Sequence, residues 1–445
     1  MMKKIFISIL SIGILFCSNQ GHVKRNYEQD KWHKNATIYE VNVRQYTAEG
    51  TFQAFLPHIE RIHDMGIDIL WFMPIHPIGE KNRKGGLGSY YSVKDYKGIN
   101  PEFGNEEDFK AIVDKAHSLD MKVLMDWVAN HTAFDHDWAN QHKEWYTLDS
   151  LNNLQPPLGT DWWDVTDLNY NNAAMRLAMI DAMKYWLGRF DIDGFRCDAA
   201  SWVPIDFWSQ AIDSLNKIKP VFMLAEAEDP ELHKAGFDMT YAWEYMHVIN
   251  GIADGSMYFE DLDKLMTKED SAYAKEAYRL YFTTNHDENS WNGSVFERYG
   301  AKHLLQAILA FTIDGMPLLY SGQEAGLNKR LKFFEKDEIE WGDYIYFDFF
   351  SALLKLNQTH PALWNGKYGG TFEKFDFADK DLYCYQRVSG KDKVLVFLNF
   401  SDTAKSIELK VANNQTYIDL FSGGKTNFLK TVTLGPLGYK VFYTN

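Results

Sequence analysis

The sequence predicts an α/β protein: a (β/α)8 TIM barrel with a small subdomain inserted after its third strand, followed by a C-terminal antiparallel β-sandwich. Three observations support this fold class. Eight short apolar runs alternate with helix-period segments, this alternation fails once over about forty residues, and the period changes to two near residue 363. A barrel typically takes about 250 residues, so the 445-residue chain has room for both domains.

The eight apolar runs are rich in β-branched and aromatic residues, as buried parallel strands are. Because they alternate with helices, we expect them to close into one barrel that spans residues 25–362, with all strands ending at a common face. The runs are residues 38–43, 67–73, 122–128, 192–197, 221–225, 237–241, 279–284 and 316–320.

Helix-period segments lie between most of these runs, with apolar residues recurring every three or four positions. Their periodic residues are Phe52, Phe55, Leu56, Ile59 and Ile62; Phe109, Ile112, Val113 and Ala116; Met175, Met179, Met183, Trp186 and Phe190; and Leu304, Leu305, Ile308 and Leu309.

The inserted subdomain, residues 133–172, is predicted where neither period is visible. This stretch contains four tryptophans and two prolines. Loops of this length are usually functional, and this one follows the third strand at the presumed active face. We therefore expect it to form one wall of a cleft.

From residue 363 to 445 the apolar residues alternate with polar ones, and turn residues separate the runs. The clearest runs are residues 382–388, 393–399 and 405–411. This pattern is typical of an antiparallel β-sandwich. The region has no cluster of catalytic residue types, so we expect it to support the barrel.

Residues 1–22 are predicted to be an export signal. Lys3 and Lys4 precede an apolar stretch that ends at Cys17 and is too short for a membrane span. Cys17 stands where bacterial lipoprotein signals carry the lipid, but Phe16 stands where they usually have a small residue. Two alternatives remain: a lipid anchor through Cys17, or plain secretion. In either case we expect an exported protein, whether extracellular, periplasmic or membrane-anchored.

The net charge argues against a nucleic-acid partner, and the positions of the remaining cysteines argue against a disulfide. A formal charge of −15 repels phosphate backbones and no local basic stripe offsets it, so we expect no nucleic-acid partner. Cys197 and Cys384 fall in different predicted domains, and we expect both to be unpaired.

Three carboxylates stand at the ends of predicted strands: Asp198, Glu226 and Asp287. Arg196 precedes Asp198 by two residues and His286 is adjacent to Asp287, so cationic neighbours are available to keep some carboxylates ionised while another stays protonated. Paired carboxylates in different protonation states are what cleavage of a glycosidic bond requires. The 14 Trp and 25 Tyr fit a sugar ligand, although any single aromatic residue is more often part of the core.

Four segments occur in a characteristic order: Asp126-Trp-Val-Ala-Asn-His131, Gly194-Phe-Arg-Cys-Asp-Ala199, Leu224-Ala-Glu226 and Thr284-Asn-His-Asp287. Together they closely resemble the signature regions of the α-amylase family, glycoside hydrolase family 13, and the chain resembles an exported bacterial member. The resemblance extends to residues 88–96, 167–169 and 319–324. It therefore covers essentially the whole chain after the predicted signal.

The resemblance implies a retaining mechanism. Asp198 would be the nucleophile, kept ionised by Arg196, and Glu226 would be the general acid and then the base. Asp287 would bind sugar hydroxyls and stabilise the transition state, while Asp126 would brace Arg196. The substrate-binding residues that the resemblance implies are Tyr91, as a stacking platform, and His131, Arg196 and His286, as a polar clamp.

Asn130 and Asp167 match positions that supply oxygen ligands to a structural calcium ion in this family. Calcium usually takes six to eight oxygens, so backbone carbonyls and water would have to supply the remaining ligands. No organic cofactor is expected. His131 and His136 lack the spacing of a helix-borne zinc pair, so no zinc site is predicted.

The strand-end carboxylates have other possible interpretations, and the chain departs from the family pattern at two places. For any one strand-end carboxylate the alternative role is a helix cap or a salt-bridge partner. Glu228 lies on the same side of its strand as Glu226 and competes with it for the acid role. Many family members have Lys-His where this chain has Ser201-Trp202, so a lysine contact on the leaving-group side is missing. Ala225 also replaces a common glycine.

We therefore expect a retaining hydrolase of α-1,4-glucosidic bonds in starch or malto-oligosaccharides. The alternatives are an α-glucan transglycosylase or α-glucosidase of the same family, and a non-catalytic glucan-binding protein. Non-catalytic relatives lose one or more of the three carboxylates, and all three are present here. The sequence leaves open the chain length of the substrate, endo or exo action and the oligomeric state.

Overall fold

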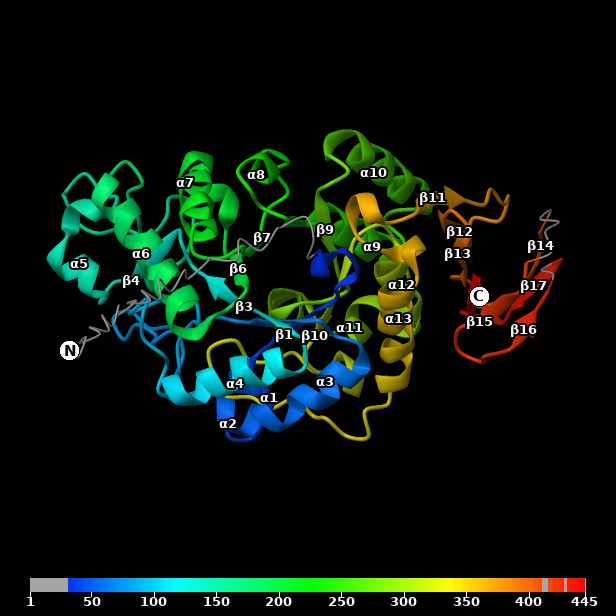
Figure 1. The fold of residues 1–445 in the computed structure, drawn as a ribbon, viewed down its shortest axis with the longest axis horizontal. Helices are drawn as coiled ribbons and strands as arrows, with labels where there is room; N and C mark the ends of the chain where they lie inside the picture. The colour runs from blue at the N-terminus through cyan, green and yellow to red at the C-terminus, as the bar shows by residue number, and fades with distance from the viewer. Residues whose placement is uncertain (1–30, 410–414, 428–429, 445) are drawn as a thin grey trace, which may run out of the picture. The chain divides into compact units, whose positions relative to one another are not determined.

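The computed structural model describes residues 31–409, 415–427 and 430–444, so the predicted signal segment and Cys17 lie outside the described residues. The predicted fold class is confirmed: eight parallel strands close into a barrel in the order β1-β10-β9-β8-β7-β6-β3-β2, with helices around it (Figure 1). The barrel strands are β1 (Ile38–Val41), β2 (Ile69–Phe72), β3 (Lys122–Trp127), β6 (Gly194–Cys197), β7 (Phe222–Ala225), β8 (Met239–Tyr241), β9 (Tyr278–Tyr281) and β10 (Met316–Tyr320).

Nearly every barrel-strand residue is buried, because side chains fill the inside of the barrel and helices cover the outside. Several strands are shorter than predicted. Thr283, for example, was predicted to lie in a strand but follows the end of β9. Its carbonyl accepts hydrogen bonds from Arg298 and Tyr299 side chains instead of a neighbouring strand.

The helices form from the apolar stripes seen in the sequence. In α4, the Asn105 side chain accepts a hydrogen bond from the Asp108 N–H and the Asp108 carboxylate accepts one from the Asn105 N–H, both at 3.0 Å. The helices are α1 (Val43–Tyr46), α2 (Phe52–Phe55), α3 (Ile59–Met65), α4 (Glu106–Ser118), α5 (Asp137–Gln141), α6 (Ala173–Phe190), α7 (Ile205–Asn216), α8 (Glu231–Lys234), α9 (Trp243–Asp254), α10 (Phe259–Ala272), α11 (Val295–Tyr299), α12 (His303–Thr312) and α13 (Phe347–Thr359). Among the described residues, none of these helices is long and apolar enough to span a bilayer.

The inserted subdomain begins where β3 ends. It contains α5 and a small antiparallel pair, β4 (His131–Ala133) and β5 (Val165–Asp167). The Tyr96 hydroxyl donates to the carbonyls of Val128, at 2.7 Å, and of His131, at 3.0 Å. These bonds fix the direction in which the subdomain leaves the barrel.

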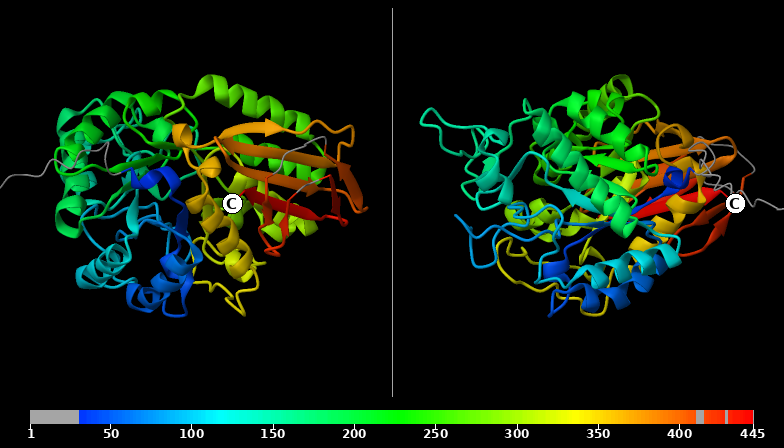
Figure 2. Two further views of the ribbon diagram at one scale, coloured as in Figure 1. Left: turned by 45° about the vertical axis from the view of Figure 1, so that its right-hand side comes forward. Right: turned by 60° about the vertical axis from the view of Figure 1, so that its left-hand side comes forward.

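The C-terminal strands form two antiparallel sheets beside α12 and α13 (Figure 2). Ile407 and Val432 of the smaller sheet share one apolar core with Leu395 and Phe397 of the larger sheet, so the two sheets pack face to face. The larger sheet contains β11 (Thr371–Lys374), β12 (Leu382–Ser389), β13 (Asp392–Asn399), β18 (Tyr439–Thr444), β15 (Tyr417–Asp419) and β16 (Lys425–Thr426), and the smaller contains β14 (Lys405–Glu408) and β17 (Thr431–Leu434).

Polar and aromatic contacts join this domain to the barrel. The Thr312 and Tyr385 hydroxyls lie 2.6 Å apart, and Arg387 Nη2 lies 2.9 Å from Asp314 Oδ1. Cys197 of the barrel and Cys384 of the sandwich are both buried free thiols.

Candidate active site

A cleft of about 830 Å3 opens at the carboxyl-terminal ends of the barrel strands. This is the face at which barrels of this type carry their binding sites. Its walls come from the segments after β2, β6, β7, β8, β9 and β10 and from the inserted subdomain. The lining residues are Lys84, Ser89, Tyr91, His131, Asp161, Trp162, Asp164, Val165, Asp198, Ala199, Ser201, Trp202, Glu226, Ala227, Glu228, Trp243, Asp287, Trp291, Phe333 and Phe334.

The three predicted carboxylates all line this cleft. Asp198 and Glu226 follow directly after β6 and β7, whose last residues, Cys197 and Ala225, are paired across the sheet. The two carboxylates therefore leave adjacent strand ends side by side. Asp287 comes from the loop after β9.

Arg196 connects the carboxylates from below. Its guanidinium is fully buried; Nη1 donates to Asp198 Oδ1 at 3.0 Å and to Asp126 Oδ1 at 2.9 Å, and Nη2 lies 3.1 Å from Glu226 Oε2. Residues two positions apart on a strand point to the same side, so β6 aims Arg196 and Asp198 together. The predicted contact between Asp126 and Arg196 is confirmed.

Glu226 is held by the backbone as well. The Ala199 N–H donates to Glu226 Oε2 at 2.8 Å. Ala199 has a φ of 42°, in the left-handed region that non-glycine residues rarely adopt, and this conformation lies immediately after Asp198. The turn at Ala199, directly after Asp198, therefore points the Ala199 N–H at the Glu226 carboxylate.

The surroundings of the two carboxylates raise the pKa of both. Burial raises the pKa of Glu226 to about 7, Arg196 opposes this rise, and the charges of Asp198 and Asp287 add to it. Burial also raises the pKa of Asp198, to about 6, again against the effect of Arg196. Burial therefore favours the protonated form of Glu226, as the acid role requires, and Arg196 favours the ionised form of Asp198, as the nucleophile role requires.

His286 joins Asp287 to a buried acid that the sequence analysis missed. Its Nδ1 lies 2.5 Å from Glu40 Oε1, and its Nε2 lies 2.7 Å from the Tyr91 hydroxyl and 3.3 Å from Asp287 Oδ2. Burial alone would lower the pKa of His286, but the Asp287 and Glu40 carboxylates raise it to about 9. Glu40 is the one charged residue in the four-residue buried strand β1. A charged residue in an otherwise apolar strand was the sequence feature that could have identified it.

The other predicted substrate-binding residues differ in their exposure to the cleft. Tyr91 and His131 line it, and burial lowers the pKa of His131 to about 4, so its imidazole is neutral near pH 7. Arg196 and His286 lie beneath the lining residues, at no more than 2% side-chain exposure. Each of them contacts carboxylates that do line the cleft: Arg196 contacts Asp198 and Glu226, and His286 contacts Asp287.

The predicted calcium residues lie together but outside the cleft lining. The Asn130 carbonyl accepts a hydrogen bond from the Leu168 N–H at 3.2 Å, which brings Asn130 next to Asp167. Asn130 Nδ2 lies 3.2 Å from His131 Nδ1. In residues 31–409, 415–427 and 430–444, no three His, Cys, Asp or Glu residues gather in a metal-binding group, so any ion here would rely on backbone carbonyls and water.

Glu228 has partners that remove it from the acid role. Its Oε1 lies 2.9 Å from Arg279 Nη2 and also accepts the Glu244 N–H at 3.0 Å. Of the two candidates in this loop, only Glu226 contacts Arg196.

The inserted subdomain was expected to form one wall of the cleft, and its Trp162 does line it, but the other aromatic residues of the walls were not identified from the sequence. Trp202, in the short helix η4 (Ala200–Trp202), stacks on Trp162 of the inserted subdomain with centroids 5.3 Å apart and an interplanar angle of 17°. Trp202 stands where the family pattern usually has histidine. A second group, Trp291 and Phe333 with Phe334, lines the cleft elsewhere.

Comparison with known proteins agrees with this geometry. The family model described as "Alpha amylase, catalytic domain" matches residues 26–345. Alpha-amylase 2 of Dictyoglomus thermophilum is 26% identical over 93% of this chain and 76% of its own length. A cyclomaltodextrin glucanotransferase of Bacillus sp. (strain 1011) is 27% identical over 89% of this chain and 61% of its own length.

Among solved structures, an alpha-amylase from Lactobacillus plantarum is 31% identical, covers 92% of this chain and 99% of its own, and superposes with a TM-score of 0.83. Sequence model, fold and strand-end carboxylates agree, and the chain belongs to the α-amylase family of glycoside hydrolases.

Proposed function

We propose that this protein hydrolyses α-1,4-glucosidic bonds in starch or malto-oligosaccharides with retention of configuration. One observation carries the proposal: Arg196 contacts both Asp198 and Glu226 at the ends of adjacent strands, in a cleft where burial raises the pKa of Glu226 to about 7. This pairing supplies one ionised and one protonated carboxyl group at the same bond.

In the first half-reaction Asp198 attacks the anomeric carbon. The bond from that carbon to the glycosidic oxygen breaks, and Glu226 gives its proton to the departing oxygen. Asp287 accepts hydrogen bonds from the hydroxyls of the sugar being transferred, and its charge stabilises the oxocarbenium-like transition state. His286 and Glu40 hold Asp287 from behind.

In the second half-reaction Glu226 takes a proton from water. The water oxygen attacks the anomeric carbon, and the bond to Asp198 breaks with its electrons returning to the carboxylate. Two inversions leave the product in the α configuration. Reducing-sugar release from soluble starch by the wild-type protein, and its loss in Asp198→Asn, test this activity.

Transglycosylation is the second candidate, because the chemistry is the same until water or a sugar hydroxyl takes the second step. The aromatic lining of the cleft favours it, since a cleft-facing side of Trp162 or Trp202 would provide a flat apolar surface for a sugar acceptor. One of the relatives is named as a transferase, the cyclomaltodextrin glucanotransferase. The ratio of transfer products to free glucose, measured at high substrate concentration, distinguishes transglycosylation from hydrolysis.

We also propose a structural calcium ion held by Asn130 and Asp167 between barrel and subdomain, with carbonyls and water completing the ligands. It would brace the subdomain and take no part in bond breaking. Calorimetry and elemental analysis after EDTA treatment test it: a lowered melting temperature that calcium restores supports the ion, and no change together with no bound calcium rejects it.

Export is proposed from Lys3, Lys4 and the apolar stretch before Cys17, all outside the described residues. A fatty-acylated N-terminal peptide beginning at Cys17 would identify a lipoprotein, and a cleaved, unacylated N-terminus would identify plain secretion. Intact Met1 on protein confined to the cytosol of the native host would reject export.

A further inference from the structure

Two loops meet across one end of the cleft. The loop after β2 donates from the Leu87 N–H to the Phe334 carbonyl at 2.9 Å, and from the Gly86 N–H to Glu335 Oε1 at 2.6 Å. Phe334 and Glu335 belong to the loop after β10. A Cβ atom at Gly85 would lie 2.5 Å from Phe334 Cβ, and Gly85 has a φ of 62°, so the approach of the two loops requires glycine at this position.

The β10 loop is braced from beneath, and we call its residues 331–337 the bridge. Gln45 Nε2 donates to the carbonyls of Lys332 and Glu335, both at 2.8 Å. The Leu331 N–H donates to Asn289 Oδ1 at 2.9 Å. Gln45 and Asn289 are both buried, so the bridge is fixed to the end of the barrel at several points.

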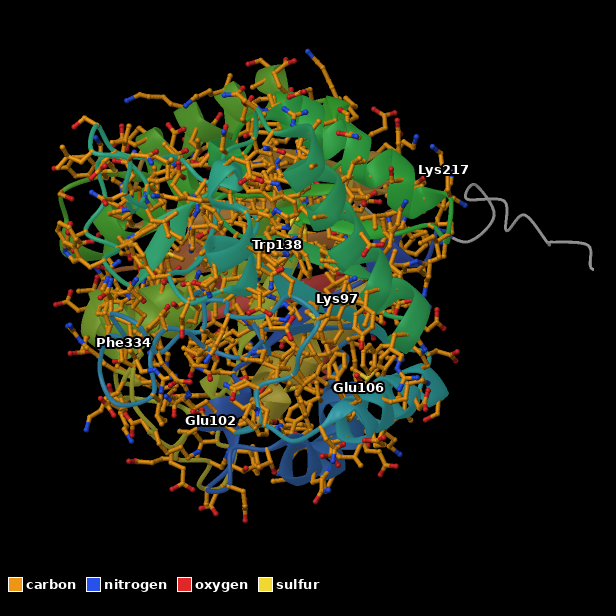
Figure 3. The ribbon with its side chains drawn as sticks, turned by 90° about the vertical axis from the view of Figure 1, so that its left-hand side faces the viewer. Lys97, Glu102, Glu106, Trp138, Lys217 and Phe334 are labelled. Atoms are coloured by element: carbon orange, nitrogen blue, oxygen red, sulfur yellow. The ribbon has the colours of Figure 1, made fainter. Side chains whose placement is uncertain are left out.

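Aromatic rings extend the bridge between the two walls of the cleft. The Phe333 ring lies 6.2 Å from Tyr91, of the β2 loop, and 5.2 Å from Trp291, of the β9 loop, measured between centroids. Phe334 packs against Phe333 and Trp291 at 5.2 and 5.7 Å. In the view of Figure 3, Phe334 lies at the edge of the face, apart from Trp138 of the inserted subdomain.

The position of Glu226 identifies which end of the cleft is bridged. The acid stands beside the oxygen that leaves, so the leaving group extends over the segment next to Glu226. That segment is η4, because Ala199 donates to the Glu226 carboxylate at 2.8 Å and Ala200 to its carbonyl at 3.3 Å. The bridge instead packs on Tyr91, on the side of His286 and Asp287 that receives the transferred sugar.

We propose that the bridge closes the cleft beyond the transferred sugar, so that the enzyme acts from the non-reducing end and releases glucose or maltose. An α-glucan cannot pass between Tyr91 and Trp291 while Phe333 contacts both rings. Internal bonds of a long chain are therefore excluded, because the chain would have to continue through the bridge. This inference rests on the proposed hydrolysis and specifies its substrate end.

The test uses maltoheptaose labelled with a fluorophore at its reducing end, with the non-reducing glucose either free or blocked by a 4,6-O-benzylidene group. We expect the first labelled products from the free substrate to be maltohexaose or maltopentaose, and the blocked substrate to react at least about 100-fold more slowly. Early labelled maltotriose or maltotetraose, or similar rates for both substrates, would overturn the inference and leave hydrolysis standing. Failure to cleave the free substrate would overturn the proposed function and this inference with it.

A variant pair examines the bridge itself. Phe333→Ala combined with Phe334→Ala should raise the ratio of blocked to free cleavage by about tenfold or more, because removing both rings opens the end of the cleft. Trp202→Ala, at the opposite end, is the matched control and should leave that ratio unchanged. A folded double variant with the wild-type ratio would contradict the proposal that the bridge closes the cleft. If the double variant does not fold, the product pattern of the wild-type protein alone tests the proposal.

Discussion

Arg196 Nη1 lies 3.0 Å from Asp198 Oδ1, and the same guanidinium, fully buried, reaches Asp126 and Glu226. A single cation thus serves three carboxylates at the centre of the site. Removing the cation from such a network typically costs about 3–5 kcal/mol, because the buried carboxylates lose its compensation. The activity of the protein therefore depends on the shape of this side chain as well as on its charge.

Arg196→Lys keeps the charge but removes the planar fork that reaches three acceptors. We expect kcat/KM on maltoheptaose to fall by about two orders of magnitude or more. Steady-state kinetics measures kcat/KM, and circular dichroism checks that the variant is folded. Arg189→Lys, at an exposed pair with Glu106, is the control and should stay near wild-type activity; a folded Arg196→Lys protein with wild-type kcat/KM would contradict the role assigned to the guanidinium.

Glu226→Gln removes the proton donor while keeping the shape. Turnover of maltoheptaose should fall strongly, whereas a 2,4-dinitrophenyl glycoside, whose leaving group needs little protonation, should lose much less. The wild-type kcat/KM should decline as pH rises through about 7, where Glu226 ionises, and this decline should be absent in the variant. Glu228→Gln is the matched control, and equal losses on both substrates would argue against Glu226 as the acid.

The same substitution should stabilise the protein at alkaline pH. The pKa of Glu226 is raised from an ordinary 4.5 to about 7, so the folded state holds this proton to higher pH than the unfolded state does. The group's favourable contribution is complete below about 4.5 and is lost as pH rises through about 7. Glu226→Gln should therefore melt above the wild type at pH 8, with a smaller difference at pH 5; a lower melting temperature at pH 8 would contradict the sign. Differential scanning calorimetry at the two pH values makes the comparison.

Trp202→Ala removes one half of the indole stack beside Glu226. Aromatic pairs contribute about 0.5–1.5 kcal/mol beyond their buried area, so KM for maltoheptaose should rise about tenfold at most. A small aryl glucoside, which does not extend over η4, should be affected much less. Trp163→Ala is the control, because Trp163 is 65% exposed and does not line the cleft; equal KM values for wild type and Trp202→Ala would remove the indole pair from substrate binding.

Local patterns made most of the fold predictable. The barrel strands are predominantly apolar, with charged exceptions such as Glu40 in β1 and Arg196 in β6, and burial on both faces leaves a clear signal in the sequence. The carboxylates at strand ends were predictable for the same reason, since the end of a strand fixes where its next side chain emerges.

Contacts between distant residues were not predictable in this way. Glu40 bonds His286 across 246 positions, and its own strand gives no sign of that partner. The bridge joins Phe334 to Leu87 through backbone atoms, which carry no residue-specific pattern. The indole stack of Trp162 on Trp202 likewise depends on how the inserted subdomain folds over the barrel.

The measurement that tests the account most directly is proton NMR of the first reducing ends released from maltoheptaose, taken before mutarotation mixes the anomers. Attack by Asp198 followed by attack of water gives two inversions, so the account predicts an initial α-anomer. An initial β-anomer would require a single displacement by water. That result would contradict Asp198 as the nucleophile and the retaining mechanism built on Arg196, Asp198 and Glu226.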